Sequence, residues 1–190
     1  MHPMRFFVAA ALLVAAALPA LAGDDILDAI DQARKAYQAG DLGNAKQQLD
    51  LASQLIGQKN AEALTKLLPA PLNGWTAEKP QAQAVGPAIF GGASMATRSY
   101  RDGNGHSVDI TITGDSAMLS AMVPLLTNPM LAGAMGKLIR VGDQRAIQAE
   151  DGDVTMVINN KFVVTVRGSA DNAAKLAYAQ AVDVARLSKM

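Results

Sequence analysis

The sequence contains no cysteine among its 190 residues. This absence excludes a disulfide framework, thiolate metal sites and cysteine nucleophiles. It also excludes a bacterial lipoprotein, which needs a cysteine directly after its cleavage point. An exported chain without cysteine fits a bacterial periplasm, where stability has to come from a packed core.

The sequence also has few histidines and no excess of positive or negative charge. The chain has two histidines, and Lys+Arg and Asp+Glu each number 17, so the formal net charge is +0. Because His2 lies in the N-terminal leader, His106 alone cannot supply the usual ligands of a zinc ion. Balanced charge gives no electrostatic footprint for nucleic acid and no polybasic surface for a membrane. We therefore expect no nucleic-acid partner, no metal and no cofactor.

The first 22 residues have the pattern of a cleavable signal peptide. Arg5 precedes an apolar run, FFVAAALLVAAALPA, that is short for a membrane span. The run ends in Ala20-Leu21-Ala22, with small residues at the positions that a signal peptidase reads. We expect residues 1–22 to be removed and the chain to reside in the periplasm, with secretion as the alternative. An uncleaved N-terminal anchor is the other interpretation of this segment.

Residues 23–68 are expected to form a helical hairpin. Apolar residues recur at helical spacing on both sides of Gly40-Asp41, with Gly57 expected to close the second helix and Asn60 to cap a short third one. The stretch AYQAGDLGNAKQQLDLASQLI, with Tyr37, its Gly-Asp turn and its regularly spaced alanines, resembles one tetratricopeptide repeat. A solenoid needs at least three repeats and no second copy is present, which favours a lone hairpin. One hairpin cannot bury both its faces, so we expect it to dock on its own domain or on another molecule.

Residues 69–190 are expected to form an α+β domain with an antiparallel sheet and helices packed on one face. A segment rich in proline and glycine precedes Trp75, which is expected to start or anchor the first strand. Alternating apolar residues then predict strands, including two hairpins that turn at DGNG and at Asn159-Asn160. A helix from about Asp171 is expected to end the chain, with four candidates to face the core: Leu176, Ala177, Val184 and Leu187.

One segment of the domain, SAMLSAMVPLLTNPMLAGAMG, contains no charged residue over positions 116–136. Pro124 and Asn128-Pro129 interrupt its helical pattern, so a membrane crossing is not expected. A core helix across the sheet is the favoured interpretation. Because methionine adapts to varied partners, the alternative is an exposed contact surface for a protein or an apolar ligand. Its candidate contact residues are Met118, Leu119, Met122, Leu126, Met130 and Met135.

The catalytic and metal-binding patterns in the sequence are weak. His106 follows a turn and is accompanied by Asp102 and Asp109, but the sequence offers no GxSxG nucleophile. The acidic-Gly cluster at Asp102 fails the spacing of a calcium-binding EF-hand loop, and it and the cluster at residues 150–153 are interpreted as turns. The scattered methionines lie in apolar patterns rather than in the close spacing of copper-binding thioethers. No catalytic residue is assigned.

Three stretches of the sequence resemble segments of small exported bacterial proteins: LPAPLNGW, RSYRDGNGHSVDITITGDSAML and VVTVRGS. This resemblance implies a periplasmic location but no mechanism. We expect a soluble periplasmic, non-enzymatic binding or protein-interaction module. A protein partner or a homo-oligomer in the cell envelope is expected. Two alternatives stay open: a carrier of a small ligand or lipid, and a carboxylate-dependent envelope enzyme near His106.

Overall fold

Two antiparallel helices form the N-terminal part of the molecule. The computed structural model describes residues 24–86, 92–114, 128, 133 and 135–190. Helix α1 spans Asp25–Gln38 and helix α2 spans Leu42–Thr65. Asp24 and Asp41 cap the two helices by accepting backbone N–H groups of their first turns. Gly40 reverses the chain between them at φ 78°, a conformation that glycine adopts without steric cost.

The prediction that Gly57 ends the second helix is wrong, because α2 continues through Gly57 and Asn60 to Thr65 without a break. A glycine inside a helix costs only about 1 kcal/mol relative to alanine. Packing on the sheet outweighs this cost, since Ala61 and Leu64 in the same stretch are fully buried. The separate third helix predicted after Asn60 is therefore the second half of α2.

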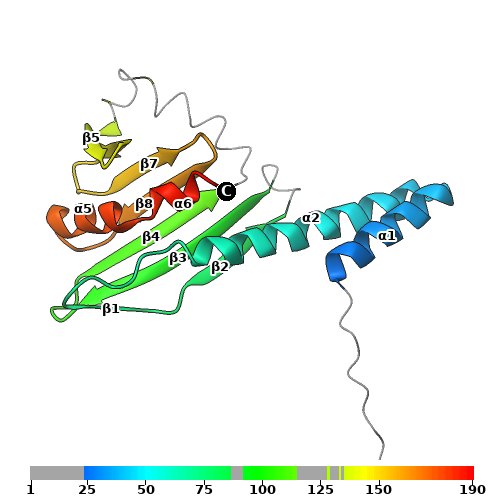
Figure 1. Cartoon of the computed structure of the whole chain (residues 1–190), viewed down its shortest axis with the longest axis horizontal. Helices are drawn as coiled ribbons and strands as arrows, with labels where there is room; N and C mark the ends of the chain where they lie inside the picture. Colours follow the sequence, from blue (N-terminus) through cyan, green and yellow to red (C-terminus); the bar gives the residue numbers. More distant parts are fainter. Residues whose placement is uncertain (1–23, 87–91, 115–127, 129–132, 134) are drawn as a thin grey trace, which may run out of the picture.

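Eight strands follow in the described ranges, and they form one antiparallel sheet in the order β1-β3-β4-β8-β7-β6-β5, with β2 also paired to β3 (Figure 1). The predicted hairpins at DGNG and Asn159-Asn160 are confirmed as the β3–β4 and β7–β8 connections. The strand bounds are β1 Trp75–Ala77, β2 Gln81–Val85, β3 Ala93–Asp102, β4 Ser107–Gly114, β5 Lys137–Val141, β6 Gln144–Gln148, β7 Val154–Ile158 and β8 Phe162–Arg167.

The register places one set of side chains under the helices and the other on the opposite face. Tyr100 pairs with Val108, and Ile110 pairs with Val166, so these apolar residues share the covered face. The residues between them are largely polar, because successive side chains of a strand alternate between faces. The core under the helices includes Ala96, Tyr100, Val108, Ile110, Ile112, Val154, Met156, Ile158, Val164 and Val166.

Helix α5 spans Asn172–Ala181 and helix α6 spans Val184–Leu187. The single C-terminal helix predicted from Asp171 is therefore divided: Val182 is extended and buried, and Asp183 caps the second piece. Of the four predicted core candidates, Leu187 is fully buried and the other three are half-buried. Both helices lie with the second half of α2 on one face of the sheet (Figure 1), so the predicted α+β architecture is confirmed.

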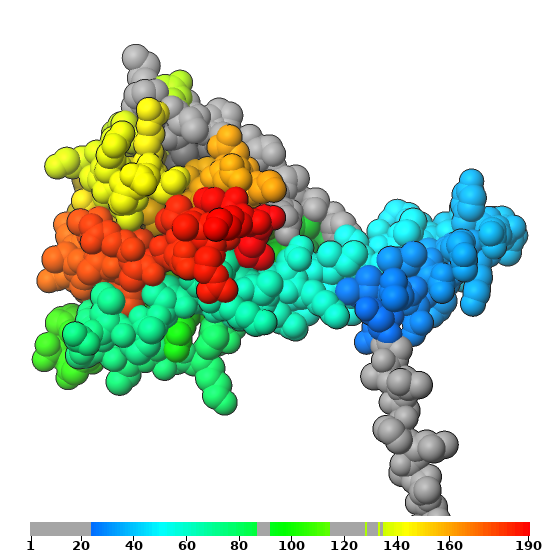
Figure 2. Space-filling model, in the orientation of Figure 1, coloured from blue at the N-terminus to red at the C-terminus, as the bar shows by residue number. Residues whose placement is uncertain are grey.

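The helical hairpin projects beyond the sheet. Helix α2 packs on β2 and β3 through its second half, while α1 packs against the first half of α2. Figure 2 shows the hairpin, in blue and cyan, standing out from the body of the molecule. Within the described ranges, no helix combines the length and apolar character needed to cross a bilayer.

Candidate functional site

The contact between α1 and α2 is built from alanines. The buried residues of α1 are Ala29, Ala33 and Ala36, and those in the projecting half of α2 are Ala45 and Ala52. Small side chains let the two helix axes approach closely. The consequence is that the hairpin buries little of its large apolar surface inside itself.

The large apolar side chains of the hairpin are exposed to solvent. Of the ten large apolar residues exposed in the described part of the chain, seven belong to α1 and α2. Six of these form what we call the hairpin apolar face, and they are between 42% and 69% exposed. The hairpin apolar face consists of Leu27, Ile30, Tyr37, Leu42, Leu49 and Ile56.

Five of these six residues lie on the same side of the hairpin, and the sixth, Leu27, lies at the outer edge of α1, about 150° from the alanine stripe. Successive residues of a helix are rotated by about 100° around its axis. On this measure Ile30 and Tyr37 lie beside the alanine stripe of α1, on the flank at larger rotation angle. Leu42, Leu49 and Ile56 lie on the corresponding flank of the alanine stripe of α2. Because the helices are right-handed and run antiparallel, these two flanks face the same way. These five residues therefore form one continuous apolar surface across both helices.

The hairpin contacts the body of the molecule at the position of Gly57. The hydroxyl of Ser94 on β3 donates a 3.1 Å hydrogen bond to the Gly57 carbonyl oxygen. A Cβ at Gly57 would lie 3.4 Å from the Cβ of Ala84 on β2, so the helix and the strand are already in contact. This close approach fixes the direction in which the apolar face points.

An aromatic cluster fastens the linker after α2 to the sheet. The rings of Tyr100 and Tyr178 lie 4.4 Å apart, and Trp75 packs edge-on against Tyr178 at 5.3 Å. Arg98 lies over the Tyr100 ring at 5.5 Å and donates hydrogen bonds to the carbonyls of Pro69 and Glu78. Burial raises the pKa of Tyr100 well above its usual range, partly opposed by Arg98, and burial also raises the pKa of Tyr178.

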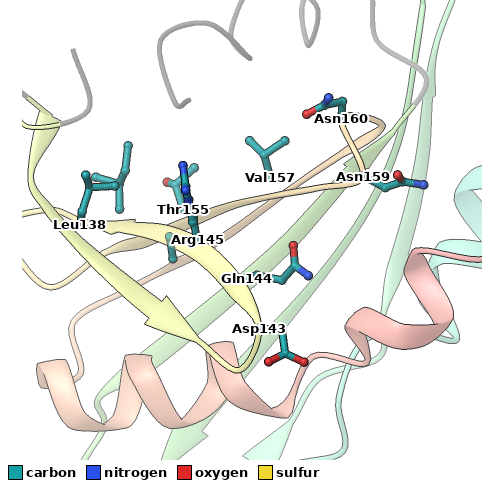
Figure 3. Close-up of a pocket in the computed structure, with 10 residues that line it drawn as sticks. Leu138, Asp143, Gln144, Arg145, Thr155, Val157, Asn159 and Asn160 are labelled. Atoms are coloured by element: carbon teal, nitrogen blue, oxygen red, sulfur yellow. The ribbon is translucent and has the colours of Figure 1, made fainter. Parts of the chain in front are cut away.

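A small hollow lies on the sheet face opposite the helices, at strands β5, β6 and β7. It has a volume of about 250 Å³. Figure 3 shows Leu138, Thr155 and Val157 on the side of these strands that faces away from α5 and α6. Arg145 also lines it and is the basic side chain there. The volume is below the ~300–1,000 Å³ that is typical of small-molecule sites.

Most of the contact residues predicted from sequence lie outside the described residues. This applies to Met118, Leu119, Met122, Leu126 and Met130. The sixth, Met135, is 47% exposed and lines a second hollow with Lys137, Gln148 and Glu150 near the start of β5. The core-helix interpretation of positions 116–136 lies outside the described residues for the same reason.

The structure brings His106 together with Asp102 but not with Asp109. The ring Nδ1 of His106 lies 2.8 Å from Asp102 Oδ2, while Asp102 Oδ1 accepts the backbone N–H groups of Asn104 and His106. The ring hydrogen bond, followed by these backbone bonds, lowers the pKa of Asp102. Asp109 instead accepts a hydrogen bond from the hydroxyl of Ser99.

The alternation of the two strands separates these carboxylates. Asp102 has the parity of Tyr100, which faces the helices, whereas Asp109 lies between Val108 and Ile110 in sequence and faces the other way. Neither of the two hollows is lined by His106. The carboxylate of Asp102 therefore serves to close the β3–β4 turn. In the described part of the chain, no cluster of three or more histidine and acidic side chains is arranged to hold a metal ion.

The sequence predicted that one face of the hairpin docks on its own domain or on another molecule, but it did not single out these six residues as the contact. The signal that distinguishes them is the separate stripe of alanines at seven-residue spacing, Ala29–Ala36 and Ala45–Ala52. The alanine stripes alone are enough to bring the two helices into close contact, so the large apolar residues stay outside that contact.

Comparisons with protein-family models, with curated proteins and with solved structures found no match for this chain.

Proposed function

We propose that this chain is an exported, periplasmic protein-interaction module without an enzymatic activity of its own, and that the hairpin apolar face is its contact surface. The observation that carries the proposal is the distribution of side-chain size in α1 and α2. Alanines make the contact between the helices, and the leucines, isoleucines and tyrosine remain in solvent. A contiguous apolar patch of this kind on a projecting element is typical of an interaction surface.

Burial of this face supplies part of the free energy that binding requires. Fully burying one large apolar side chain contributes about 1.5–3 kcal/mol. The six side chains of the face are each about half exposed, so a partner that covers them contributes roughly 5–9 kcal/mol before the cost of association. That amount is sufficient for a specific complex only if the partner contributes an apolar surface of its own.

The charge of the hairpin favours a protein over a membrane as the partner. Residues 24–65 contain seven acidic and four basic side chains. Amphipathic helices that lie on membranes are rich in lysine and arginine on their polar face, because lipid surfaces are anionic. The acidic excess here opposes adsorption to such a surface.

Site-directed photo-crosslinking in cells that export the chain tests the proposal. A photoreactive amino acid is placed at Ile30 or Leu49 on the hairpin apolar face, or at Gln32 or Gln47 on its polar sides as matched controls. We expect protein adducts in the periplasmic fraction from Ile30 and Leu49, and none from the controls. Adducts that are absent at all four positions, or equally frequent at all four, contradict the proposal.

Binding of a small ligand is a second candidate function, favoured by the hollow at β5–β7. Leu138, Ile147 and Val157 offer apolar contacts there, and Arg145 offers a positive charge. Native mass spectrometry of protein purified from its own periplasm tests this function. A retained ligand that is lost in a Val157→Trp variant, in which the new side chain fills the hollow, supports it; a ligand-free spectrum of the wild-type chain opposes it.

A further inference from the structure

We propose that the hollow at β5–β7 binds a small carboxylate with an apolar tail, whose head is held between Arg140 and Arg145 while the tail lies on the apolar side chains beside them. This inference rests on the second function proposed above, because it names the class of ligand that the hollow takes. It does not involve the hairpin apolar face.

The two arginines are direct neighbours on adjacent strands. Arg140 of β5 pairs with Arg145 of β6 in the register of the sheet. Residues that pair in this way project from the same face, with their Cβ atoms about 4.5–5.5 Å apart. Like charges at this position are destabilising. An anion held between the two guanidinium groups replaces this repulsion by two attractive contacts.

The described part of the chain offers no acidic partner to this pair. None of its ion pairs includes Arg140 or Arg145. Asp143 lies between them in sequence and borders the same hollow. Figure 3 shows the Asp143 carboxylate directed towards α5 and α6, away from Arg145. The two guanidinium groups are therefore available to an anion from outside the chain.

The chemistry of the pair suits a carboxylate. A guanidinium group is planar and donates two parallel N–H bonds to the two oxygens of a carboxylate. Arg145 is half-buried, and Ile147 on the same strand is only 5% exposed. Ile147 faces away from the helices, because its neighbour Ala146 pairs with Met156 in the core. Surroundings that exclude water in this way strengthen a hydrogen bond between charged groups.

The charge count favours a carboxylate over a phosphate. This end of the β5–β6 hairpin carries two guanidinium groups and the carboxylate of Asp143. A ligand with one negative charge leaves it neutral. A phosphate monoester carries a charge of about −1.5 to −2 at pH 7, and Asp143 repels the surplus.

The apolar side chains lie directly beside the arginines. On β5, Leu138 precedes Arg140 by two positions and shares its face. On β6, Ile147 follows Arg145 by two positions and shares its face in the same way. Val157 of β7 lines the hollow with them, and Figure 3 shows it on the same side of the sheet as Leu138 and Arg145. A ligand can therefore place its head on the arginines and its tail on these apolar residues.

The volume of the hollow limits the length of the tail. It measures about 250 Å³. An apolar cavity of about 150 Å³ holds benzene, which has six carbon atoms, so by proportion this hollow takes roughly ten. A carboxylate with a medium-length alkyl chain or a single aromatic ring meets this limit.

Isothermal titration calorimetry of the purified, exported chain with sodium octanoate is the first test. We expect octanoate to bind with a dissociation constant of about 0.1–1 mM. We expect 1-octanol, which has the same tail without the charge, to bind at least roughly tenfold more weakly, and acetate, which has the head without the tail, to give no heat of binding. Octyl phosphate that binds more tightly than octanoate overturns the carboxylate assignment.

Substitution of single arginines tests the position of the head. Arg140→Gln and Arg145→Gln are each expected to weaken octanoate binding roughly tenfold and to leave 1-octanol binding unchanged. Arg145→Lys keeps the charge but loses the planar fork, so we expect an intermediate loss. Arg167→Gln is the matched control: it removes an arginine from the same face of the sheet, on β8, and is expected to bind octanoate as wild type. Equal losses in Arg145→Gln and Arg167→Gln overturn the site.

The stability of the unliganded chain provides a second readout. Because Arg140→Gln and Arg145→Gln each remove the repulsion between like charges, we expect their urea midpoints to equal or exceed that of wild type. Loss of binding in a variant that is at least as stable as wild type is not a consequence of unfolding. A clear fall of both midpoints shows that the arginines stabilise the fold, and it overturns a role reserved for a ligand.

The outcomes separate this inference from the function on which it rests. A wild-type chain that does not bind octanoate overturns the ligand class proposed here. If native mass spectrometry then finds a retained neutral molecule that is lost in Val157→Trp, the hollow is a ligand site of another class. If the retained molecule is a carboxylate that is lost in both Val157→Trp and Arg145→Gln, both inferences are supported.

Discussion

The hydroxyl of Tyr100, buried near the C-terminal end of β3, donates a 2.7 Å hydrogen bond to the carbonyl oxygen of Pro69. The same oxygen accepts a 3.1 Å bond from Arg98 Nη1. Two side chains of one strand thus hold the residue at which the chain leaves the end of α2. The backbone N–H of Leu72 donates to the hydroxyl of Tyr178, which extends the attachment to α5. The projecting hairpin is oriented by these contacts and by those at Gly57.

Replacement of Tyr100 by phenylalanine is expected to weaken this attachment moderately. The change removes one buried hydrogen bond, which contributes about 1 kcal/mol, and leaves Arg98 bonded to Pro69. Urea unfolding, followed by the fluorescence of the single tryptophan, Trp75, measures the free energy of unfolding. A midpoint equal to that of wild type would contradict a structural role for the hydroxyl.

Tyr100 also makes the fold sensitive to alkaline pH. Burial raises its folded-state pKa, so between the ordinary tyrosine value of ~10 and the folded value the native state holds a proton that the unfolded state has lost. The contribution of this proton to the free energy of unfolding is fully present below pH ~10, and it declines as the pH rises above that value. The Tyr100→Phe variant is expected to lose stability less steeply over this range, and adding Tyr178→Phe should flatten the profile further. Equal slopes in wild type and Tyr100→Phe would contradict this assignment.

Gly57 is expected to tolerate alanine but not leucine. An added methyl group would meet Ala84 at 3.4 Å, an ordinary contact distance, and alanine favours the helix. A leucine has no space between α2 and β2, and we expect it to cost about 1–3 kcal/mol. The matched control is Gly43→Leu, because a Cβ at Gly43 meets only the Asp41 carboxylate at 3.7 Å. Thermal unfolding of the four variants, including Gly43→Ala, provides the comparison.

The ion pair of Lys175 and Asp153 is expected to respond asymmetrically to mutation. Lys175 Nζ lies 2.8 Å from Asp153 Oδ1 and donates to the Asp151 carbonyl at 2.7 Å. The lysine side chain is 3% exposed and the aspartate 22%, so removing the aspartate leaves the more deeply buried charge without its ionic partner. We expect Asp153→Ala to cost about 3 kcal/mol, and Lys175→Met less.

The double variant Lys175→Met/Asp153→Ala is expected to be more stable than Asp153→Ala alone, because it removes the unpaired charge as well. Arg167→Ala is the control, since its Nε lies 3.8 Å from Asp153 and the side chain is 68% exposed. Its effect should remain within about 0.5 kcal/mol. Urea midpoints at constant slope measure all four variants. A Lys175→Met variant less stable than Asp153→Ala would contradict the burial argument.

The β7–β8 turn is expected to select residues that accept positive φ. Asn159 and Asn160 have φ of 52° and 51°, and Lys161 donates its N–H to the Ile158 carbonyl across the turn. Asn160→Gly should leave stability unchanged or raise it, whereas Asn160→Val should cost roughly 1–2 kcal/mol. Lys161→Val, one residue further on, is the control and should have little effect. Thermal unfolding checks the order of the three variants.

Much of the fold is predictable from local patterns. Val108, Ile110 and Ile112 alternate with polar residues, and this alternation predicted a strand with one buried face, which the sheet confirms. Positive φ at Asn159 and Asn160 followed from the known tolerance of asparagine for that conformation. These features are decided by a residue and its immediate neighbours. They do not depend on what packs against them.

The helix boundaries that were predicted wrongly depend on distant contacts. Gly57 has the local signal of a helix end, but Ser94 and Ala84 hold the backbone of α2 against the sheet at that point. At the C-terminus, the apolar period continues through Val182, but its burial in the core bends the chain and separates α5 from α6. In both cases tertiary packing outweighs the local tendency of the backbone to end or continue a helix, which is worth about 1 kcal/mol.

The amino-acid sequence alone determined the α+β class, the strands, the turns and the presence of a helical hairpin, because the periods of apolar residues and the backbone limits of glycine, asparagine and proline act over a few residues. Only the tertiary structure decided which stripe of each hairpin helix is buried. A helix with alanines on one stripe and large apolar residues on the next can pack through either. The choice of the alanines, which leaves Ile30 and Leu49 in solvent, is made by the approach of α1 to α2 and the anchoring of α2 on the sheet.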